Sequence, residues 1–517
     1  MDRRAFLRGA AVLGAGTLAA AAAGCGSPSH SSGSGSTTST TKVDHGPPDW
    51  STLATSLGGP LLLPTDSGYA AAGHLYNALY TPDAAAIAQC ASVSDVQRCL
   101  AFCRAHGVDV VARSGGHSYA AYSTCPGLVI DVTSFDQVTV GGAAGSSGLT
   151  AVTVGAGTIL INVYDQLGAK GLLLPGGSCP TVGITGLTLG GGIGVFGRAY
   201  GLTCDQVTNV ELVTADGVTH HCGPGTDADL YWASRGGGGG NFGVVTSFGF
   251  RAHPIPAAIT LFTLEWPWGA AAAVLDAWLR WIPTAPDELW ANCQLYASGS
   301  AGSGLVKVTG VFVGSVSACT AALDPLTSAI GEATTDHFVG PEDYLTAMMI
   351  EGGCEGESAA QCAAPVSSPF VAKSSYVGGP LPEKTVHTIV SSLSSLPNSL
   401  PGAGGGVVFD GYGGAINQVD ASETAFVHRS AVACAQYSVT YPSATPTGGQ
   451  KAAATGWLQG LEDAFAPVTQ GSYLNYIDPT LDDWQQAYYG ANLSRLRQIK
   501  QQHDPDDVFH FAQSIPT

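Results

Sequence analysis

Charged side chains are scarce in this sequence, and basic ones are the scarcest. Only 11% of the 517 residues are charged, and 20 Lys and Arg stand against 39 Asp and Glu, which gives a formal net charge of −19 at pH 7. A surface with this excess of negative charge repels phosphate groups rather than collecting them. The composition therefore argues against a protein that binds DNA or RNA.

Sequence motifs for protein-bound metals are also missing. No C-x-x-C segment pairs with a second one, and no H-E-x-x-H segment occurs, so a zinc site is unsupported and we predict no metal. No solenoid period is visible either. With 45% hydrophobic residues, the chain is long enough to form two domains that each bury a core.

Residues 1–46 predict an export signal and a flexible linker rather than a folded domain. Arg3 and Arg4 precede an apolar stretch that ends near Gly24 and is too short and too rich in Ala and Gly to span a membrane. The arginine pair matches the twin-arginine signal of proteins exported already folded, which indicates a cofactor inserted inside the cell. The sequence around Cys25 is similar to a lipoprotein cleavage box. Release from the cell and a lipid anchor at Cys25 both stay open, and a membrane is a partner only in the second case.

Thirteen cysteines in an exported chain suggest disulfides. Cys354 and Cys362 bracket a polar loop and form the first expected pair, whereas Cys204 with Cys222 is a weaker one. An odd number of cysteines remains once Cys25 and one special cysteine, introduced below, are set aside. At least one thiol should therefore stay free.

The order of apolar segments predicts a mixed chain with a domain boundary near Pro256. Before this point, short buried strands alternate with helices, one of which should begin after Ser94 as its N-cap. Asp216 and Gly217 predict the turn of a β-hairpin. Beyond Pro256, longer apolar strands alternate with helices.

Three glycine-rich segments lie in the first part of the chain: RSGGHS at 113–118, GGSCPTVGITGLTLGGGIGVFG at 176–197 and SRGGGGGNFGVV at 234–245. Glycine lets backbone N–H groups approach a phosphate without a side chain in the way. Three such segments suggest a long cofactor that carries phosphates. The order of strand, G-x-G-x-x-G, helix and acidic residue that defines a Rossmann site is missing, so that fold is disfavoured.

These segments, followed by YLNYIDP, YYGANLSRL and QSIP near the C-terminus, resemble the berberine-bridge-enzyme-like flavoprotein oxidases over residues 57–516. The resemblance implies an α+β fold, in which a PCMH/vanillyl-alcohol-oxidase-type FAD-binding domain is joined to a substrate domain of antiparallel sheet backed by helices. We expect the FAD-binding domain at 47–255, the substrate-binding domain at 256–470, and a C-terminal segment at 471–517 that returns to the FAD-binding domain.

The resemblance also implies FAD attached through two covalent bonds. His117, at the tip of a glycine turn, would bond to the methyl group of the flavin's benzenoid ring, and Cys179 in G-x-C-P-x-V-G would form the second bond. A histidine that only caps a loop, and a small buried thiol or disulfide partner, are the alternatives. Further cofactor contacts are implied for Arg113, Ser114, Gly115, Gly116, Ser118, Val182, Gly183, Gly186, Gly190, Gly191, Gly192, Gly243, Val245, Tyr473 and Asn475.

Hydride transfer to a flavin needs a base that takes the hydroxyl proton of the substrate. Tyr476, the second tyrosine of YLNYID, matches the catalytic base of the family, and such a tyrosine needs a lowered pKa to act near neutral pH. Asp410 and Tyr412 are expected on one strand face as its partners, and Gln436 is a weaker candidate. A structural role for Tyr476 and a turn role for Asp410 stay open.

Together these features predict an exported, monomeric or weakly associating FAD-linked oxidase. Its substrate would be an alcohol, lactol or similar C–H site of an oligosaccharide or natural product, with molecular oxygen as acceptor and H2O2 as product. The resemblance also implies that Val182 lines the path by which oxygen reaches the flavin, and that a leucine at this position would close that path. The alternatives are a flavin dehydrogenase with another acceptor and a binding protein on an inactive flavoenzyme fold.

Overall fold

The computed structural model describes residues 48–144, 148–297, 300 and 302–517. The predicted export signal and linker at 1–46, including the arginine pair and Cys25, lie outside the described residues. Among the described helices, none is both long enough and apolar enough to cross a membrane.

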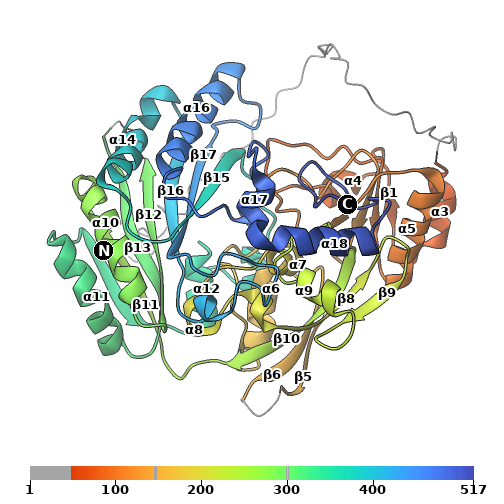
Figure 1. Cartoon of the computed structure of the whole chain (residues 1–517), viewed down its shortest axis with the longest axis horizontal. Helices are drawn as coiled ribbons and strands as arrows, with labels where there is room; N and C mark the ends of the chain where they lie inside the picture. The colour runs from red at the N-terminus through yellow and green to blue at the C-terminus, as the bar shows by residue number, and fades with distance from the viewer. Residues whose placement is uncertain (1–47, 145–147, 298–299, 301) are drawn as a thin grey trace.

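Three β-sheets form the framework of the described chain (Figure 1). A four-stranded sheet runs in the order β1-β2-β4-β3, with β1 at Leu61–Leu62, β2 at Ala86–Gln89, β3 at Val110–Arg113 and β4 at Leu128–Asp131. A six-stranded sheet runs in the order β5-β6-β10-β8-β9, with β7 paired to β10; these strands are β5 (Val138–Ala143), β6 (Thr150–Gly155), β7 (Leu172–Leu173), β8 (Val207–Val213), β9 (Thr219–Cys222) and β10 (Val244–Pro254).

The third sheet has seven strands in the order β14-β11-β13-β12-β16-β17-β15, and all its neighbours are antiparallel. Its strands are β11 (Ile259–Trp266), β12 (Leu289–Ala297), β13 (Gly304–Val313), β14 (Asp336–Pro341), β15 (Phe370–Val377), β16 (Gly404–Gly411) and β17 (Ala433–Thr440). This sheet confirms the antiparallel sheet expected for the second part of the chain.

The helices of the first part are α3 (Trp50–Ser56), α4 (Tyr69–Ala72), α5 (Val93–His106), α6 (Leu160–Gly168), α7 (Ile184–Leu189), α8 (Gly197–Tyr200) and α9 (Ala228–Ala233). Among them, α5 packs against β4 and β8, whereas α8 packs against β12 of the seven-stranded sheet. The N-cap of α5 is Ser92, not Ser94 as expected. Ser92 is in an extended conformation and its side chain accepts a hydrogen bond from the Asp95 N–H, whereas Ser94 already lies in the first helical turn.

The predicted hairpin at Asp216 and Gly217 joins β8 to β9 and is confirmed. Gly217 has a φ of 83°, in the left-handed region that glycine adopts at little cost. The Asp216 carboxylate accepts a hydrogen bond from the Val218 N–H at 3.1 Å, and the Thr214 N–H donates to the Val218 carbonyl at 3.0 Å. A short polar turn therefore closes the hairpin as the sequence indicated.

Four long helices cover one face of the seven-stranded sheet, namely α10 (Ala271–Trp281), α11 (Val316–Ile330), α14 (Glu383–Ser399) and α16 (Gly448–Phe465) (Figure 1). In β16 the side chains alternate between the two faces. Val407 and Phe409 belong to the core beneath these helices, together with Trp278 and Leu461. Asp410 points to the opposite face, which is free of the four helices. Short helices connect the strands, at α12 (Tyr344–Glu351), α13 (Ala359–Cys362) and α15 (Ala415–Gln418).

The C-terminal residues return to the first part of the chain. Here lie α17 (Trp484–Tyr489) and α18 (Leu493–His503), and α18 contacts α9 (Figure 1). Leu496 and Phe509 share a hydrophobic core with Val210 and Phe248 of the six-stranded sheet. This packing agrees with a returning C-terminal segment, although the exact domain boundaries stay a prediction.

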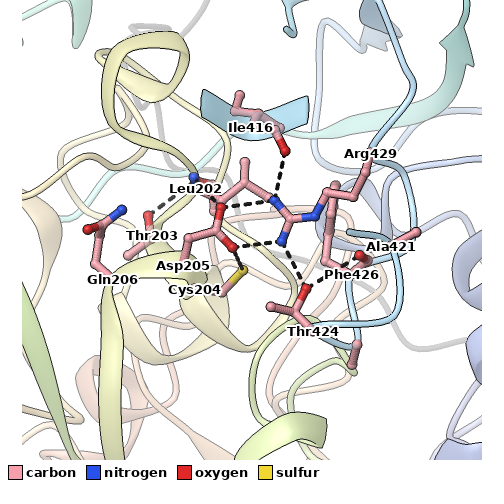
Figure 2. Close-up of polar contacts among 12 residues, drawn as sticks. Leu202, Thr203, Cys204, Asp205, Gln206, Ile416, Ala421, Thr424, Phe426 and Arg429 are labelled. Atoms are coloured by element: carbon pink, nitrogen blue, oxygen red, sulfur yellow. Dashed lines mark hydrogen bonds and ion pairs between the residues drawn. The ribbon is translucent and has the colours of Figure 1, made fainter. Parts of the chain in front are cut away.

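A buried ion pair links the turn η1 (Thr203–Gln206) to the loop before β17 (Figure 2). The Asp205 carboxylate accepts hydrogen bonds of 2.7 and 2.9 Å from the Arg429 guanidinium, and the two side chains are 8% and 4% exposed. Arg429 also donates to Thr424 Oγ1 at 2.8 Å and to the Ile416 carbonyl at 3.2 Å. Because η1 follows the second glycine-rich segment, this pair ties that segment to the seven-stranded sheet.

Cys354 and Cys362 form a disulfide, which confirms the first expected pair. The weaker pairing of Cys204 with Cys222 is wrong. Cys204 lies in η1 with its sulfur 3.6 Å from the Asp205 carboxylate, whereas Cys222 ends β9 opposite Val210 of β8. Both thiols are free, so the expectation of at least one free thiol is also confirmed.

Candidate active site

A cavity of about 400 Å³ lies where the three glycine-rich segments, the C-terminal segment and the seven-stranded sheet meet. Seventeen of the residues singled out from the sequence line it: Arg113, Ser114, Gly115, Gly116, His117, Ser118, Cys179, Val182, Gly183, Gly186, Gly243, Val245, Asp410, Gln436, Tyr473, Asn475 and Tyr476. Segments from the beginning, middle and end of the chain thus converge on one site.

Gly190, Gly191 and Gly192 lie behind the cavity lining rather than in it. A Cβ atom on Gly190 would lie 2.0 Å from the Asn475 side-chain oxygen, so this glycine makes room for Asn475. The Gly192 N–H donates to the Tyr473 hydroxyl oxygen at 3.0 Å. Gly190 and Gly192 therefore support two cavity residues, and a contact of these glycines with a cofactor stays a prediction.

Tyr412 follows directly after β16, and its expected role as a partner of Tyr476 stays a prediction. Strand β16 ends at Gly411, but the Tyr412 N–H still donates to the Val432 carbonyl at 2.9 Å, and burial, with a contribution from the charge of Asp410, raises the pKa of Tyr412. Its hydroxyl group is hydrogen-bonded to the Tyr376 hydroxyl at 2.9 Å, its carbonyl accepts from Arg198, and the residue is 1% exposed. Tyr412 is part of a buried aromatic cluster and is not among the described residues that line the cavity.

The turn that carries His117 follows directly after β3. A Cβ atom on Gly115 would lie 2.4 Å from the Gly183 nitrogen, so the first two glycine-rich segments touch backbone to backbone. The ring of Tyr76 stacks on the His117 ring with centroids 4.2 Å apart. Burial lowers the pKa of His117 to about 4, and the nearby His74 adds to this effect. The imidazole is therefore neutral near pH 7 and keeps a free lone pair.

Polar groups around this turn fit the phosphates of a dinucleotide. The Ser114 hydroxyl donates to the Ala156 carbonyl at 2.7 Å, and Arg113 donates to the His74 carbonyl, so both side chains hold the turn in shape. Residues 115–117, by contrast, line the cavity, and their backbone N–H groups donate to no acceptor among the described residues. Unpaired N–H groups in a glycine turn form an anion-binding cradle.

Cys179 is a half-buried free thiol at the edge of the cavity. Burial raises its pKa, and hydrogen bonds from Thr181 and from the Val182 N–H oppose that rise. A hydrogen bond holds the Cys179 segment against α6, since the Ile161 N–H donates to the Pro180 carbonyl at 3.0 Å. The thiol therefore faces the cavity from a rigid loop.

The Tyr476 hydroxyl group donates a hydrogen bond of 3.1 Å to the Asp410 carboxylate. Burial raises the pKa of Tyr476 well above its ordinary value, and the charge of Asp410 adds to the rise. We expected a lowered tyrosine pKa from the sequence, and this expectation is wrong because the pKa of Tyr476 is raised. Burial also raises the pKa of Asp410, to about 7. Near neutral pH, the Asp410 carboxylate rather than a tyrosinate is therefore the group of this pair that is available to take up a proton.

One further ring and two side-chain amides surround the pair. Tyr119 stacks on Tyr476 with centroids 5.7 Å apart, and the Gln436 amide donates to the Tyr119 hydroxyl at 2.8 Å. On the other side, the Asn475 amide donates to the Leu187 carbonyl at 3.0 Å. Tyr476 is thus fixed between the sheet and the second glycine-rich segment.

Several cavity residues were not identified from the sequence. Tyr76 and Tyr119 lie outside the recognised motifs. The position of Tyr119, two residues after His117, is the signal that could have identified it. Gly238, Gly239 and Gly240 line the cavity within a segment that was recognised as glycine-rich. No cluster of three or more His, Cys, Asp or Glu that could hold a metal occurs among the described residues.

Two family models match the chain: "FAD binding domain" over residues 84–223 and "Berberine and berberine like" over residues 472–516. The chain is also 33% identical, over 83% of its length and 90% of the relative, to the uncharacterized FAD-linked oxidoreductase YgaK of Bacillus subtilis (strain 168). The chain therefore belongs to the berberine-bridge-enzyme-like family and is an FAD-linked oxidoreductase.

Relatives with named substrates are more distant. The glucooligosaccharide oxidase of Sarocladium strictum is 28% identical to this chain, over 86% of this chain and 89% of the relative. The tetrahydroberberine oxidase of Berberis wilsoniae is also 28% identical, over 82% of this chain and 83% of the relative. Among solved structures, BBE-like 1 of Physcomitrella patens has a TM-score of 0.82 at 28% identity and covers 90% of this chain and 99% of its own. The expected α+β fold with a PCMH-type FAD-binding domain is confirmed.

Proposed function

We propose that this FAD-linked oxidoreductase is an oxidase that holds FAD through His117 and Cys179 and oxidises an alcohol or lactol carbon, with O2 as the acceptor. The observation that carries the proposal is the Tyr476–Asp410 hydrogen bond, which lies in the same cavity as both attachment residues. A base and two nucleophiles in one cavity are what a covalent flavin oxidase requires.

FAD supplies the acceptor for a hydride when it is bound. The cradle of free N–H groups at 115–117 would hold its phosphates, and the neutral His117 ring and the Cys179 thiol would hold its ring system at two points. Attachment at two points keeps a cofactor in place without full enclosure, which leaves the cavity open for a bulky substrate.

The protein's part in the reaction is proton removal. As the substrate carbon gives up a hydride, its hydroxyl proton passes to the Tyr476 oxygen, while the Tyr476 proton passes along the 3.1 Å hydrogen bond to Asp410. The substrate thus loses one proton and one hydride and becomes a carbonyl compound. Because tyrosine donates as it accepts, no free tyrosinate has to form.

The strand face around Asp410 supports a hydroxyl-rich substrate. Asn292 of β12 lies directly opposite Asp410, Thr309 of β13 lies opposite Asn292, and Gln294 follows on the same face. Amide and hydroxyl side chains of this kind can hydrogen-bond sugar hydroxyl groups, and the three residues lie in β12 and β13 rather than among the described residues that line the cavity. The likeness to a glucooligosaccharide oxidase and a xylooligosaccharide oxidase supports an oligosaccharide as the substrate.

A peroxide assay tests this function. The purified protein is mixed in air with a panel of oligosaccharides, phenolic alcohols and other natural products, and H2O2 release is measured beside O2 consumption in a Clark electrode. We expect at least one sugar to give equal amounts of both. Flavin that is bleached by a substrate without O2 uptake would instead favour a dehydrogenase, and flavin that no compound bleaches would favour a binding protein.

We also propose export by the twin-arginine route, on the basis of Arg3 and Arg4. Replacing both arginines by lysine keeps the charge and should retain the yellow protein inside the cell. Mass spectrometry of the exported wild-type N-terminus then distinguishes a lipid on Cys25 from simple release. Export of the lysine variant at the wild-type level would contradict this route.

A further inference from the structure

The side chain of Thr181 lies between the two residues proposed to attach FAD. Its Oγ1 atom is 2.9 Å from Nε2 of His117. The hydroxyl group and the N–H of Thr181 also lie close enough to the Cys179 sulfur to oppose the rise that burial causes in the pKa of its thiol. Thr181 is 6% exposed and is not among the described residues that line the cavity. It therefore contacts both side chains without reaching the cofactor space itself.

The backbone around Thr181 is held on both sides. A Cβ atom on Gly115 would lie 3.1 Å from the Thr181 carbonyl oxygen, which shows how closely the His117 turn approaches. From the other side, the Leu160 N–H donates to the Val182 carbonyl at 2.9 Å. The hydroxyl group of Thr181 is thus fixed in position relative to both attachment residues.

A threonine hydroxyl has one proton to donate, so its direction matters. If His117 carries its proton on Nε2 and donates it to Thr181, then Nδ1 keeps its lone pair and the Thr181 proton is left for the Cys179 sulfur. In the opposite direction, Thr181 donates to Nε2, the imidazole proton sits on Nδ1, and the sulfur loses that donor. The first direction prepares both side chains as nucleophiles at the same time.

We propose that Thr181 is a positioning residue for both covalent attachments of FAD. Its hydroxyl group keeps the His117 proton on Nε2 and donates a hydrogen bond to the Cys179 thiolate. The inference rests on the proposed attachment through His117 and Cys179. In each attachment, the nitrogen or sulfur forms a bond to a flavin carbon and that carbon gives up one proton. The nucleophile gives up another proton, from Nε2 of His117 or from the Cys179 sulfur. Two electrons enter the flavin, and O2 removes them together with the two protons as H2O2.

The ionisable groups that surround the two nucleophiles come from several elements; they are His74 and Arg113 near His117, and Tyr76, Tyr119 and Tyr164 near Cys179. Burial lowers the pKa of His74 and raises the pKa of each of these tyrosines, so they are uncharged near neutral pH. The thiolate therefore depends on hydrogen bonds for its stabilisation, which makes the Thr181 hydroxyl important.

The test compares T181V, which removes the hydroxyl at nearly constant shape, with T181S, which retains it. Each change is made alone and combined with H117A or C179A, so that one attachment can be followed at a time. After acid precipitation, flavin in the pellet is covalent and flavin in the supernatant was bound without a covalent bond. We expect T181V to lower the covalent fraction at least about tenfold in both single-attachment backgrounds, with the protein still yellow before precipitation, and T181S to restore it.

A pH series separates positioning from a merely structural role. Incubation of the T181V/H117A protein with FAD at higher pH should restore attachment through Cys179, because the thiolate then forms without the hydroxyl. The T181V/C179A protein should show no such recovery. Equal covalent fractions in T181V and wild type would overturn the inference while leaving the proposed function intact.

A colourless wild-type pellet would instead refute the proposed attachment itself. If T181V does not accumulate, T181A removes the same hydroxyl with a smaller side chain and decides the question. If neither variant accumulates while T181S does, the role of Thr181 is structural and the inference fails.

Discussion

Replacing Asp410 by asparagine should slow catalysis and stabilise the fold at the same time. Asparagine can accept the hydrogen bond of Tyr476 but cannot take up its proton. Flavin reduction should therefore slow by the ~10²–10⁴-fold expected for a lost general base. In the wild type, the reduction rate should rise with pH through about 7, since Asp410 must be ionised to act. This rise should be absent in D410N.

The stability effect follows from the same pKa. The pKa of Asp410 rises from its usual 3.8 to about 7 in the folded protein, so above pH 7 the fold carries a carboxylate that would be better solvated in the unfolded chain. At about 1.4 kcal/mol per pKa unit, this penalty is at most about 4 kcal/mol. It is absent below pH 3.8, where both states are neutral, and complete above about 7. D410N should thus unfold at higher denaturant than wild type at pH 8 and show no such gain at pH 4.

Anaerobic stopped-flow mixing with substrate measures flavin reduction across pH, and denaturant titrations measure stability. E351Q is the matched control, because the Glu351 charge contributes to the raised pKa of Asp410. It should move the rise in rate to lower pH without removing it. A D410N enzyme that is reduced at the wild-type rate, or that keeps the rise near pH 7, would refute the reasoning.

The remaining predictions concern Tyr476, Val182 and the buried ion pair. Y476F should keep its flavin content while flavin reduction slows about 10²–10⁴-fold in stopped-flow measurements; an unchanged rate would move the base elsewhere. V182L adds one carbon beside the proposed oxygen path. Reoxidation of the pre-reduced enzyme in aerated buffer should therefore slow strongly, while reduction of the flavin by substrate is nearly unchanged. Reoxidation at the wild-type rate would favour another route for O2. D205N leaves Arg429 buried without its partner and should destabilise the fold by about 3–5 kcal/mol. D276N breaks the exposed pair of Asp276 with Arg280 in α10 and should cost at most about 1 kcal/mol in the same denaturant titration. Equal losses would show that burial does not set the cost.

Local patterns in the sequence predicted those features that depend on neighbouring residues. The Asp216–Gly217 hairpin and the Cys354–Cys362 disulfide fall into this group, because turn chemistry and short spacing decide them. The glycine turn at His117 was also visible, since two glycines before a histidine indicate a close backbone approach.

Features that depend on tertiary contacts could not be predicted in this way. Tyr76 stacks on His117, and the Asp205–Arg429 pair spans 224 positions, so no local pattern marks either contact. The packing of Tyr412 in a buried aromatic cluster outside the cavity lining could not be foreseen either, because its neighbours come from distant parts of the chain. The prediction of a lowered pKa for Tyr476 was wrong because burial, which a sequence does not show, outweighs any stabilisation of the tyrosinate.

In the proposed oxidase, His117 and Cys179 both attach FAD in the cavity that holds the Tyr476–Asp410 pair. The most direct test of this attachment is the flavin content of acid-precipitated protein, measured by absorbance and by the mass of the intact chain. We expect yellow pellets for wild type, H117A and C179A, each with the mass of one FAD added, and a colourless pellet for the H117A/C179A double variant. A colourless wild-type pellet, or a yellow pellet from the double variant, would contradict this proposal.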